Sequence, residues 1–141
     1  MIQGYWIPVL HSHLPFIKHP KHENFLEEHW LFEAITECYI PLLKRLYLLE
    51  NENIDFRLTV SITPPLAEML DDEHLMRKYN NYLNKAIRLG YEEIERTKQN
   101  DEYRNIAIFY KDFFEETQTF FNTVLQGNVL NGYRHFYHKG L

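Results

Sequence analysis

Two short hydrophobic runs predict β-strands. Residues 5–10 form an uninterrupted apolar run that is too brief for a helix, so we expect a strand that is buried on both faces. Pro8 lies inside this run and cannot donate a ladder hydrogen bond, which places that side of the strand at an edge or a bulge. In residues 56–62 apolar and polar side chains alternate, which is the period of a second strand.

A loop and a long helix separate the two strands. Residues 11–28 hold two prolines among several histidines and lysines, and we expect them to form a long loop. From Leu31 to Leu49 apolar residues recur at helical spacing, which predicts a helix. Pro41 should kink or divide this helix near Tyr39, and the polar residues 51–53 should end it.

Helices are predicted for the remainder of the chain. The Thr63 hydroxyl is expected to cap a short helix that begins at Pro64. Asp71 or Asp72 can cap the next helix and Asp101 another, and these two long helices should pair as a hairpin.

A last short helix follows Gly127 and ends at Gly140, which suits a helix C-terminus. The aromatic residues between positions 79 and 91, and between 103 and 121, recur at helical spacing, so we assign them to packing.

The order of elements predicts an α/β fold. A strand, a helix, a strand and a further helix indicate a parallel sheet with helical crossovers. Two parallel strands with about five helices make a helix-rich chain that does not close a barrel, and barrel enzymes usually run to about 250 residues. We therefore expect residues 1–141 to be the N-terminal portion of a larger domain, cut before a third strand.

Composition narrows the classes of function. With 141 residues, 45% hydrophobic and 25% charged, the chain should form one globular unit. A net charge of −5 argues against a nucleic-acid partner. The N-terminus lacks the basic residues of a secretory signal, and no apolar run approaches the roughly 18 residues of a membrane span, so we expect no membrane partner.

The single cysteine, Cys38, cannot form an internal disulfide, which fits a cytoplasmic location. Its neighbours Ile35, Tyr39 and Leu42 are spaced as one helix face. This spacing predicts a buried and inert thiol.

His11 and His13 follow the first predicted strand and are candidate ligand-binding residues. Side chains two apart on a strand point to the same face, and α/β folds bind ligands at the carboxyl ends of their strands. The pair can hydrogen-bond adjacent sugar hydroxyls, bind a divalent metal, or serve only structure. His19 and His22 are expected to be plain exposed loop residues.

Trp30 and Glu33 lie at the start of the long helix. The tryptophan can stack on a sugar ring while the carboxylate holds a hydroxyl. Alternatively, Trp30 anchors the loop on the core and Glu33 favours the helix N-terminus. No glycine-rich phosphate loop, nucleophile elbow or His-Glu-x-x-His motif is present, and we expect neither a cofactor nor a metal.

Three stretches carry a resemblance to a known family. They are residues 4–16 with the His-x-His-Leu-Pro form, residues 27–43, and residues 61–67. Together they resemble the N-terminus of glycoside hydrolase family 57, and within it the α-1,4-glucan branching enzymes and the related α-amylase-like branch. The resemblance spans essentially the whole chain.

The resemblance implies an incomplete (β/α)7 barrel that acts on α-glucans, such as maltooligosaccharides, amylose or glycogen-like chains, with retention of configuration. His11 matches the histidine that lines the sugar site, His13 its companion, and Trp30 an aromatic position near the substrate groove. With Glu33 they form our set of substrate-binding residues. The family's nucleophile, a glutamate, and its acid/base, an aspartate, belong to later strands, so this chain holds no catalytic residue and should be inactive alone.

Two other functions stay open at this point. One is a metal-dependent hydrolase that uses His11 and His13 as first-strand ligands. The other is a non-catalytic helical interaction module. The unpaired sheet edges also predict self-association of the chain.

Overall fold

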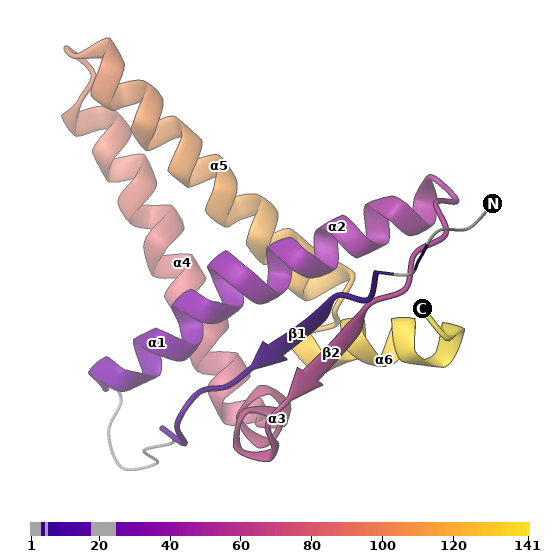
Figure 1. Cartoon of the computed structure of the whole chain (residues 1–141). Helices are drawn as coiled ribbons and strands as arrows, with labels where there is room; N and C mark the ends of the chain where they lie inside the picture. The colour runs from indigo at the N-terminus through magenta and orange to yellow at the C-terminus, as the bar shows by residue number, and fades with distance from the viewer. Residues whose placement is uncertain (1–3, 5, 18–24) are drawn as a thin grey trace.

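Two short strands, β1 (Val9–Ser12) and β2 (Thr59–Ile62), pair in parallel in the computed structural model, which describes residues 4, 6–17 and 25–141. His11 lies opposite Ser61 in the register, and Ser12 lies opposite Ile62. Helices connect the strands and follow them, as Figure 1 shows. This arrangement confirms a helix-rich α/β chain with two parallel strands.

The prediction that the first strand is buried on both faces is wrong. Within β1, Val9 is 61% exposed and Leu10 is 40% exposed. These neighbouring side chains point to opposite faces of the strand, so the described residues leave both faces partly open to solvent.

Both strands are also shorter than the sequence pattern predicts. The ladder begins where the Pro8 carbonyl accepts a hydrogen bond of 3.2 Å from the Thr59 amide. Because proline accepts such a bond but cannot donate one, regular pairing starts only at Val9. The predicted start of the first strand, Tyr5, lies outside the described residues.

The long helix between the strands has three consecutive segments: α1 (Leu26–Ala34), the π-helical η1 (Ile35–Tyr39) and α2 (Ile40–Asn51). This helix begins at Leu26, whereas the loop before it was predicted to extend to residue 28. The division near Tyr39 is confirmed. Pro41 has no amide hydrogen for the bond to residue 37, and the wider π-turn accommodates this missing bond.

The π-turn also changes the direction in which Cys38 faces. This cysteine is exposed, which contradicts the predicted buried thiol. A π-turn holds more residues per turn than an α-helix, so it rotates the helical face that regular spacing would bury. Ile35 and Tyr39 stay in the core while Cys38 faces solvent.

Helix α3 (Pro64–Asp71) begins at its predicted residue, but not with the predicted cap. The Thr63 side chain makes no capping hydrogen bond, and its Oγ1 atom is buried with no hydrogen-bond partner in the described structure. Pro65 occupies a position whose amide normally donates to the cap, and proline has no amide hydrogen to give.

Helices α4 (Glu73–Arg96) and α5 (Asp101–Thr123) form the predicted hairpin. It projects away from the sheet, toward the upper left of Figure 1. Asp72 caps α4 by accepting a 2.9 Å hydrogen bond from the Leu75 amide. Asn100, rather than the predicted Asp101, caps α5 through the Tyr103 amide at 3.2 Å.

Tyr79 of α4 joins the hairpin to the long helix. Its ring is fully buried and lies edge-on to Phe121 of α5, with ring centroids 5.0 Å apart. Its hydroxyl lies 3.0 Å from Oγ1 of Thr36 in η1, and Thr36 in turn donates to the Phe32 carbonyl. Burial raises the pKa of the Tyr79 phenol well above its usual range.

The assignment of the aromatic stripes to packing holds only near the base of the hairpin. Tyr79 and Phe121 are buried, whereas Tyr103 is 61% exposed and Phe109 is 63% exposed. Far from α1 and α2 the two helices of the hairpin pack mainly on each other. Two helices cannot cover all their faces, so the remaining aromatic side chains lie in solvent.

The last helix, α6 (Val129–Lys139), ends at Gly140, whose φ of 71° is the left-handed conformation predicted for this glycine. Glu50, near the end of α2, holds α6 in place. It accepts a 2.8 Å hydrogen bond from His135 Nε2 and another from Lys139 Nζ. These two bonds lower the pKa of the Glu50 carboxyl.

No helix within the described ranges is both long and apolar enough to cross a lipid bilayer.

Replacing Gly90 by alanine should destabilise the chain. A Cβ atom at position 90 would lie 2.8 Å from Cβ of Lys111 and 3.1 Å from its Cα, so α4 and α5 would have to separate. Alanine favours a helix by about 1 kcal/mol over glycine, but we expect a net loss of about 1–3 kcal/mol from overpacking. Urea denaturation measures the change, with exposed Arg88→Ala as control. A more stable Gly90→Ala chain would contradict the close helix contact.

Acid should weaken the attachment of α6. The folded pKa of Glu50 lies below its unfolded value, so this stabilisation is present above the unfolded pKa and is lost as the pH falls through the folded one. Glu50→Gln should therefore lower Tm at neutral pH and reduce the loss of Tm below about pH 4.3. Exposed Glu52→Gln is the control. Parallel Tm profiles for the Glu50→Gln chain and the unmodified chain would contradict the proposed anchor.

Candidate functional site

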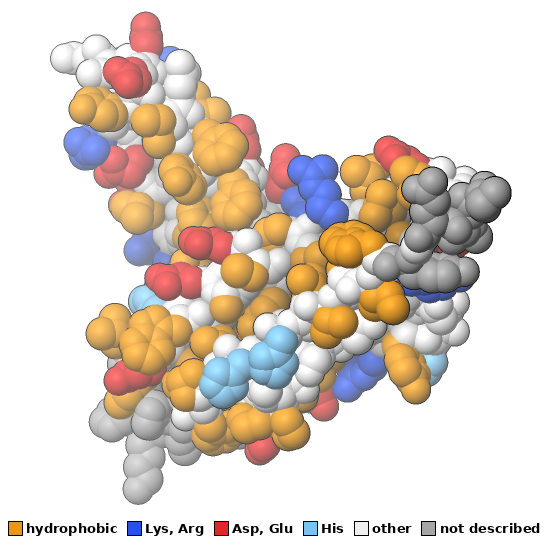
Figure 2. Space-filling model, viewed as in Figure 1, with side chains coloured by type: hydrophobic (Ala, Val, Ile, Leu, Met, Phe, Trp, Pro, Cys, Tyr) orange, Lys and Arg blue, Asp and Glu red, His pale blue; other side chains and the backbone are white. Residues whose placement is uncertain are grey.

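His11 and His13 project together from the end of β1. Their rings are parallel within 5°, with centroids 6.5 Å apart, and both side chains are exposed. Figure 2 shows a pair of histidine side chains side by side over this part of the sheet. The prediction that both imidazoles face the same way is confirmed.

A residue of the neighbouring strand contacts the first imidazole. Nδ1 of His11 lies 3.2 Å from Oγ of Ser61, its partner in the β-ladder. This contact orients the ring and leaves Nε2 for a ligand. A neutral imidazole offers one donor and one acceptor, so the two rings suit neighbouring hydroxyl groups.

The described residues contain no group of three or more histidine, cysteine, aspartate or glutamate side chains placed to hold a metal ion. His19 and His22, expected to be exposed loop residues, lie outside the described residues.

Trp30 and Glu33 project from α1. Trp30 is 50% exposed and Glu33 is exposed, so neither is part of the core. No hydrogen bond or ring contact in the described structure joins either residue to His11 or His13. Glu33 influences Tyr82 of α4. Burial of the Tyr82 phenol raises its pKa, and the negative charge of Glu33 raises it further.

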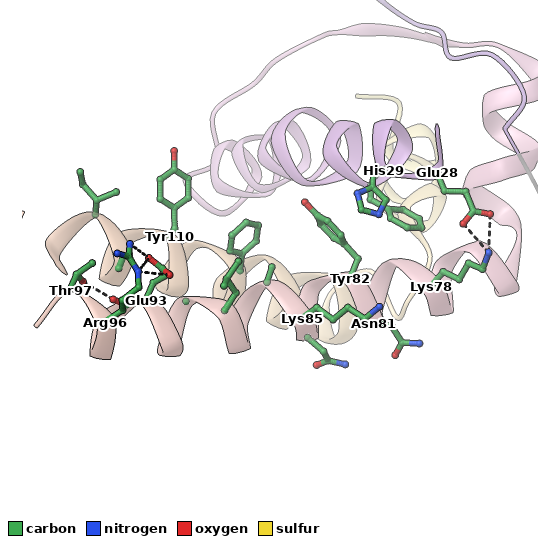
Figure 3. Close-up of a pocket in the computed structure, with 18 of the residues that line it drawn as sticks. Glu28, His29, Lys78, Asn81, Tyr82, Lys85, Glu93, Arg96, Thr97 and Tyr110 are labelled. Carbon is green, nitrogen blue, oxygen red and sulfur yellow. Dashed lines mark hydrogen bonds and ion pairs between the residues drawn. The ribbon is translucent and has the colours of Figure 1, made fainter. Parts of the chain in front are cut away.

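A large groove lies between α1 and the hairpin. Its volume is about 1240 Å³, and side chains of α1, α4 and α5 line it (Figure 3). The sequence pattern did not predict this groove, because it assigned the aromatic residues of both hairpin helices to packing. The sequence feature on α1 that could have indicated the groove is His29, one residue before Trp30.

A buried ion pair closes one end of the groove. Glu28 of α1 is 2% exposed, and its two carboxylate oxygens lie 2.9 and 2.8 Å from Nζ of Lys78. Next to this pair, the His29 ring meets Tyr82 edge-on with centroids 5.8 Å apart. Figure 3 shows His29 and Tyr82 pointing toward each other between α1 and α4.

Another ion pair marks the far end of the groove, near the tip of the hairpin. Arg96 Nε lies 2.9 Å from each carboxylate oxygen of Glu93, and these contacts lower the pKa of Glu93. Thr97 donates to the Glu93 carbonyl at 2.6 Å. Tyr110 of α5 lies between the two ends and is 53% exposed.

Comparisons with known proteins connect the chain to one family. Residues 7–140 match the family described as glycosyl hydrolase family 57. A 1,4-alpha-glucan branching enzyme of Thermococcus kodakarensis is 29% identical over 141 residues, which are 99% of this chain and 20% of that protein. A probable 1,4-alpha-glucan branching enzyme of Mycobacterium tuberculosis is 32% identical over 83 residues, covering 58% of this chain and 15% of that protein.

Two solved structures share the fold. The α-amylase AmyC from Thermotoga maritima superposes with a TM-score of 0.85 at 45% identity, covering 95% of this chain and 25% of that one. A family 57-type branching enzyme from Pyrococcus horikoshii gives a TM-score of 0.89 at 33% identity, covering 99% and 26%. The chain thus spans about a quarter or less of the length of these relatives.

Replacing Lys78 by methionine should cost more stability than breaking an exposed ion pair. The change leaves the buried Glu28 carboxylate without this cation, and we expect a loss of about 3 kcal/mol. The matched control is Lys44→Met, which breaks the more exposed pair with Glu116 and should cost less than about 1 kcal/mol. Urea denaturation measures both changes, and equal small losses would refute the distinction.

Proposed function

The chain belongs to glycosyl hydrolase family 57, and from this membership we propose that it is the N-terminal part of an α-glucan-active catalytic domain. The domain is an incomplete (β/α)7 barrel of which residues 1–141 supply the first two strands. Parallel pairing of β1 and β2 with helical crossovers supports this assignment. The relatives are branching enzymes and an α-amylase, and this supports an α-glucan substrate.

The proposed reaction is the retaining cleavage of an α-1,4 linkage. A carboxylate attacks the anomeric carbon, and a carboxylic acid protonates the leaving oxygen. Water or a glucan hydroxyl then releases the sugar from the enzyme, giving hydrolysis or branching respectively. Both carboxyl groups belong to later parts of the barrel, so this chain contributes one wall of the site and no catalytic residue.

The parallel pair of His11 and His13 carries the proposal. Both imidazoles project from the carboxyl end of a parallel strand, the edge where α/β folds bind ligands. Ser61 holds the His11 ring from one side, so its other nitrogen is directed away from β2. This nitrogen can bond a sugar hydroxyl, and such a contact raises the rate when it tightens as charge develops at the anomeric carbon.

Trp30 and Glu33 extend this wall along α1. A half-exposed indole suits stacking on a sugar ring, and an exposed carboxylate suits a sugar hydroxyl. The single cysteine is consistent with a cytoplasmic enzyme, which is part of the same proposal.

A chimera tests the proposed function. Residues 1–141 would replace the matching quarter of the Thermotoga α-amylase, to which they are 45% identical. We expect the chimera to cleave α-glucan and the isolated chain to be inactive. His11→Ala in the chimera should lower kcat and kcat/KM by roughly 100-fold, the usual cost of losing a polar contact made in the transition state.

His138→Ala, an exposed change on α6, is the matched control and should leave kcat and Tm unchanged. If His11→Ala lowers Tm while the folded chimera keeps its kcat, His11 is structural and the assignment fails.

A further inference from the structure

The groove between α1 and the hairpin is separate from the histidine pair and has the shape of a binding site for a chain molecule. It follows α4 from Lys78 to Arg96, and at 1.5 Å per residue this path is about 27 Å long. Its near end lies beside His29, the residue that precedes Trp30 on α1. His29 lines the groove, whereas Trp30 and Glu33 of α1 are not among its lining residues, so the groove lies beside the proposed site on a different face of α1.

Most of the charged side chains that line the groove are paired with one another. The lining holds two carboxylates and three lysine or arginine side chains. Glu28 pairs with Lys78 at one end, and Glu93 pairs with Arg96 at the other. These paired charges exert a weak field on a ligand, and Lys85 is the one cation of the described lining that neither carboxylate pairs with, so the lining suits an uncharged molecule that accepts a hydrogen bond from an ammonium group.

Between the two ion pairs the lining combines apolar surface with polar groups. Tyr110 and Leu89 are more than half exposed and face a cavity instead of the core. Lys85 and Asn81 line the same stretch, and no hydrogen bond or ion pair engages either side chain within the described part of the chain. Rings that present a flat apolar face, next to free donors and acceptors, match the two faces and hydroxyl rims of sugars.

We infer that this groove binds a linear α-1,4-glucan away from the reacting bond, with Tyr110 as the stacking ring and Lys85 as a hydroxyl donor. The inference rests on the proposed function for its ligand class. Such a groove would hold a remote part of the substrate or acceptor chain while the strand-end site holds the reacting sugar. It would give the enzyme a preference for long chains over short ones.

The experiment uses the 141-residue chain and maltoheptaose in isothermal titration calorimetry. We expect saturable binding that Tyr110→Ala weakens about tenfold, a typical result for truncating an aromatic anchor. Lys85→Ala should weaken binding by a smaller factor. Tyr137→Ala, an 80% exposed tyrosine of α6 outside the groove, should leave the Kd unchanged. Circular dichroism of each variant verifies that the helices are intact.

Other outcomes overturn the inference and are distinguishable from failure of the proposed function. Binding that His11→Ala abolishes and Tyr110→Ala leaves intact would assign the sugar to the strand-end site alone. Absence of maltoheptaose binding, or a dimer that Tyr110→Ala dissociates, would make the groove a protein-packing surface. The chimera tests the proposed function separately, because it measures catalysis through His11.

Discussion

The structure depends on the packing of Tyr79 between the long helix and the hairpin. This ring is fully buried against Phe32 of α1 and Phe121 of α5, and its hydroxyl meets Thr36 inside the π-helical segment. Burying a phenol without a hydrogen-bond partner would be costly, so the Thr36 hydroxyl stabilises the junction together with the apolar contacts. The angle at which the hairpin leaves the molecule follows from this junction.

The groove is a consequence of the same junction. Because the hairpin is attached to α1 only near its base, the two diverge toward the tip and leave space between them. The Glu28–Lys78 pair closes this space near the base, where both side chains are largely buried. Farther out, Tyr103, Ile106 and Tyr110 remain exposed although their spacing is that of a packed helix face.

The strand pair positions the other candidate site by a different principle. Parallel pairing places His11 opposite Ser61, and the two-residue period of the strand then aligns His13 with His11. The histidine geometry thus depends on local backbone regularity and one neighbouring strand. The groove, in contrast, depends on how far apart three helices lie.

The local periods of this sequence were enough to predict the two parallel strands, the hairpin, the helix division near Tyr39 and the shared direction of His11 and His13. Each of these depends on backbone geometry that repeats over a few residues. The exposure of Cys38 follows from the local π-turn, which the apolar spacing did not reveal. Tertiary structure alone decided that β1 is exposed and that the groove exists. Burial depends on which elements meet across long distances in sequence, and a periodic pattern states which face is apolar without stating what covers it.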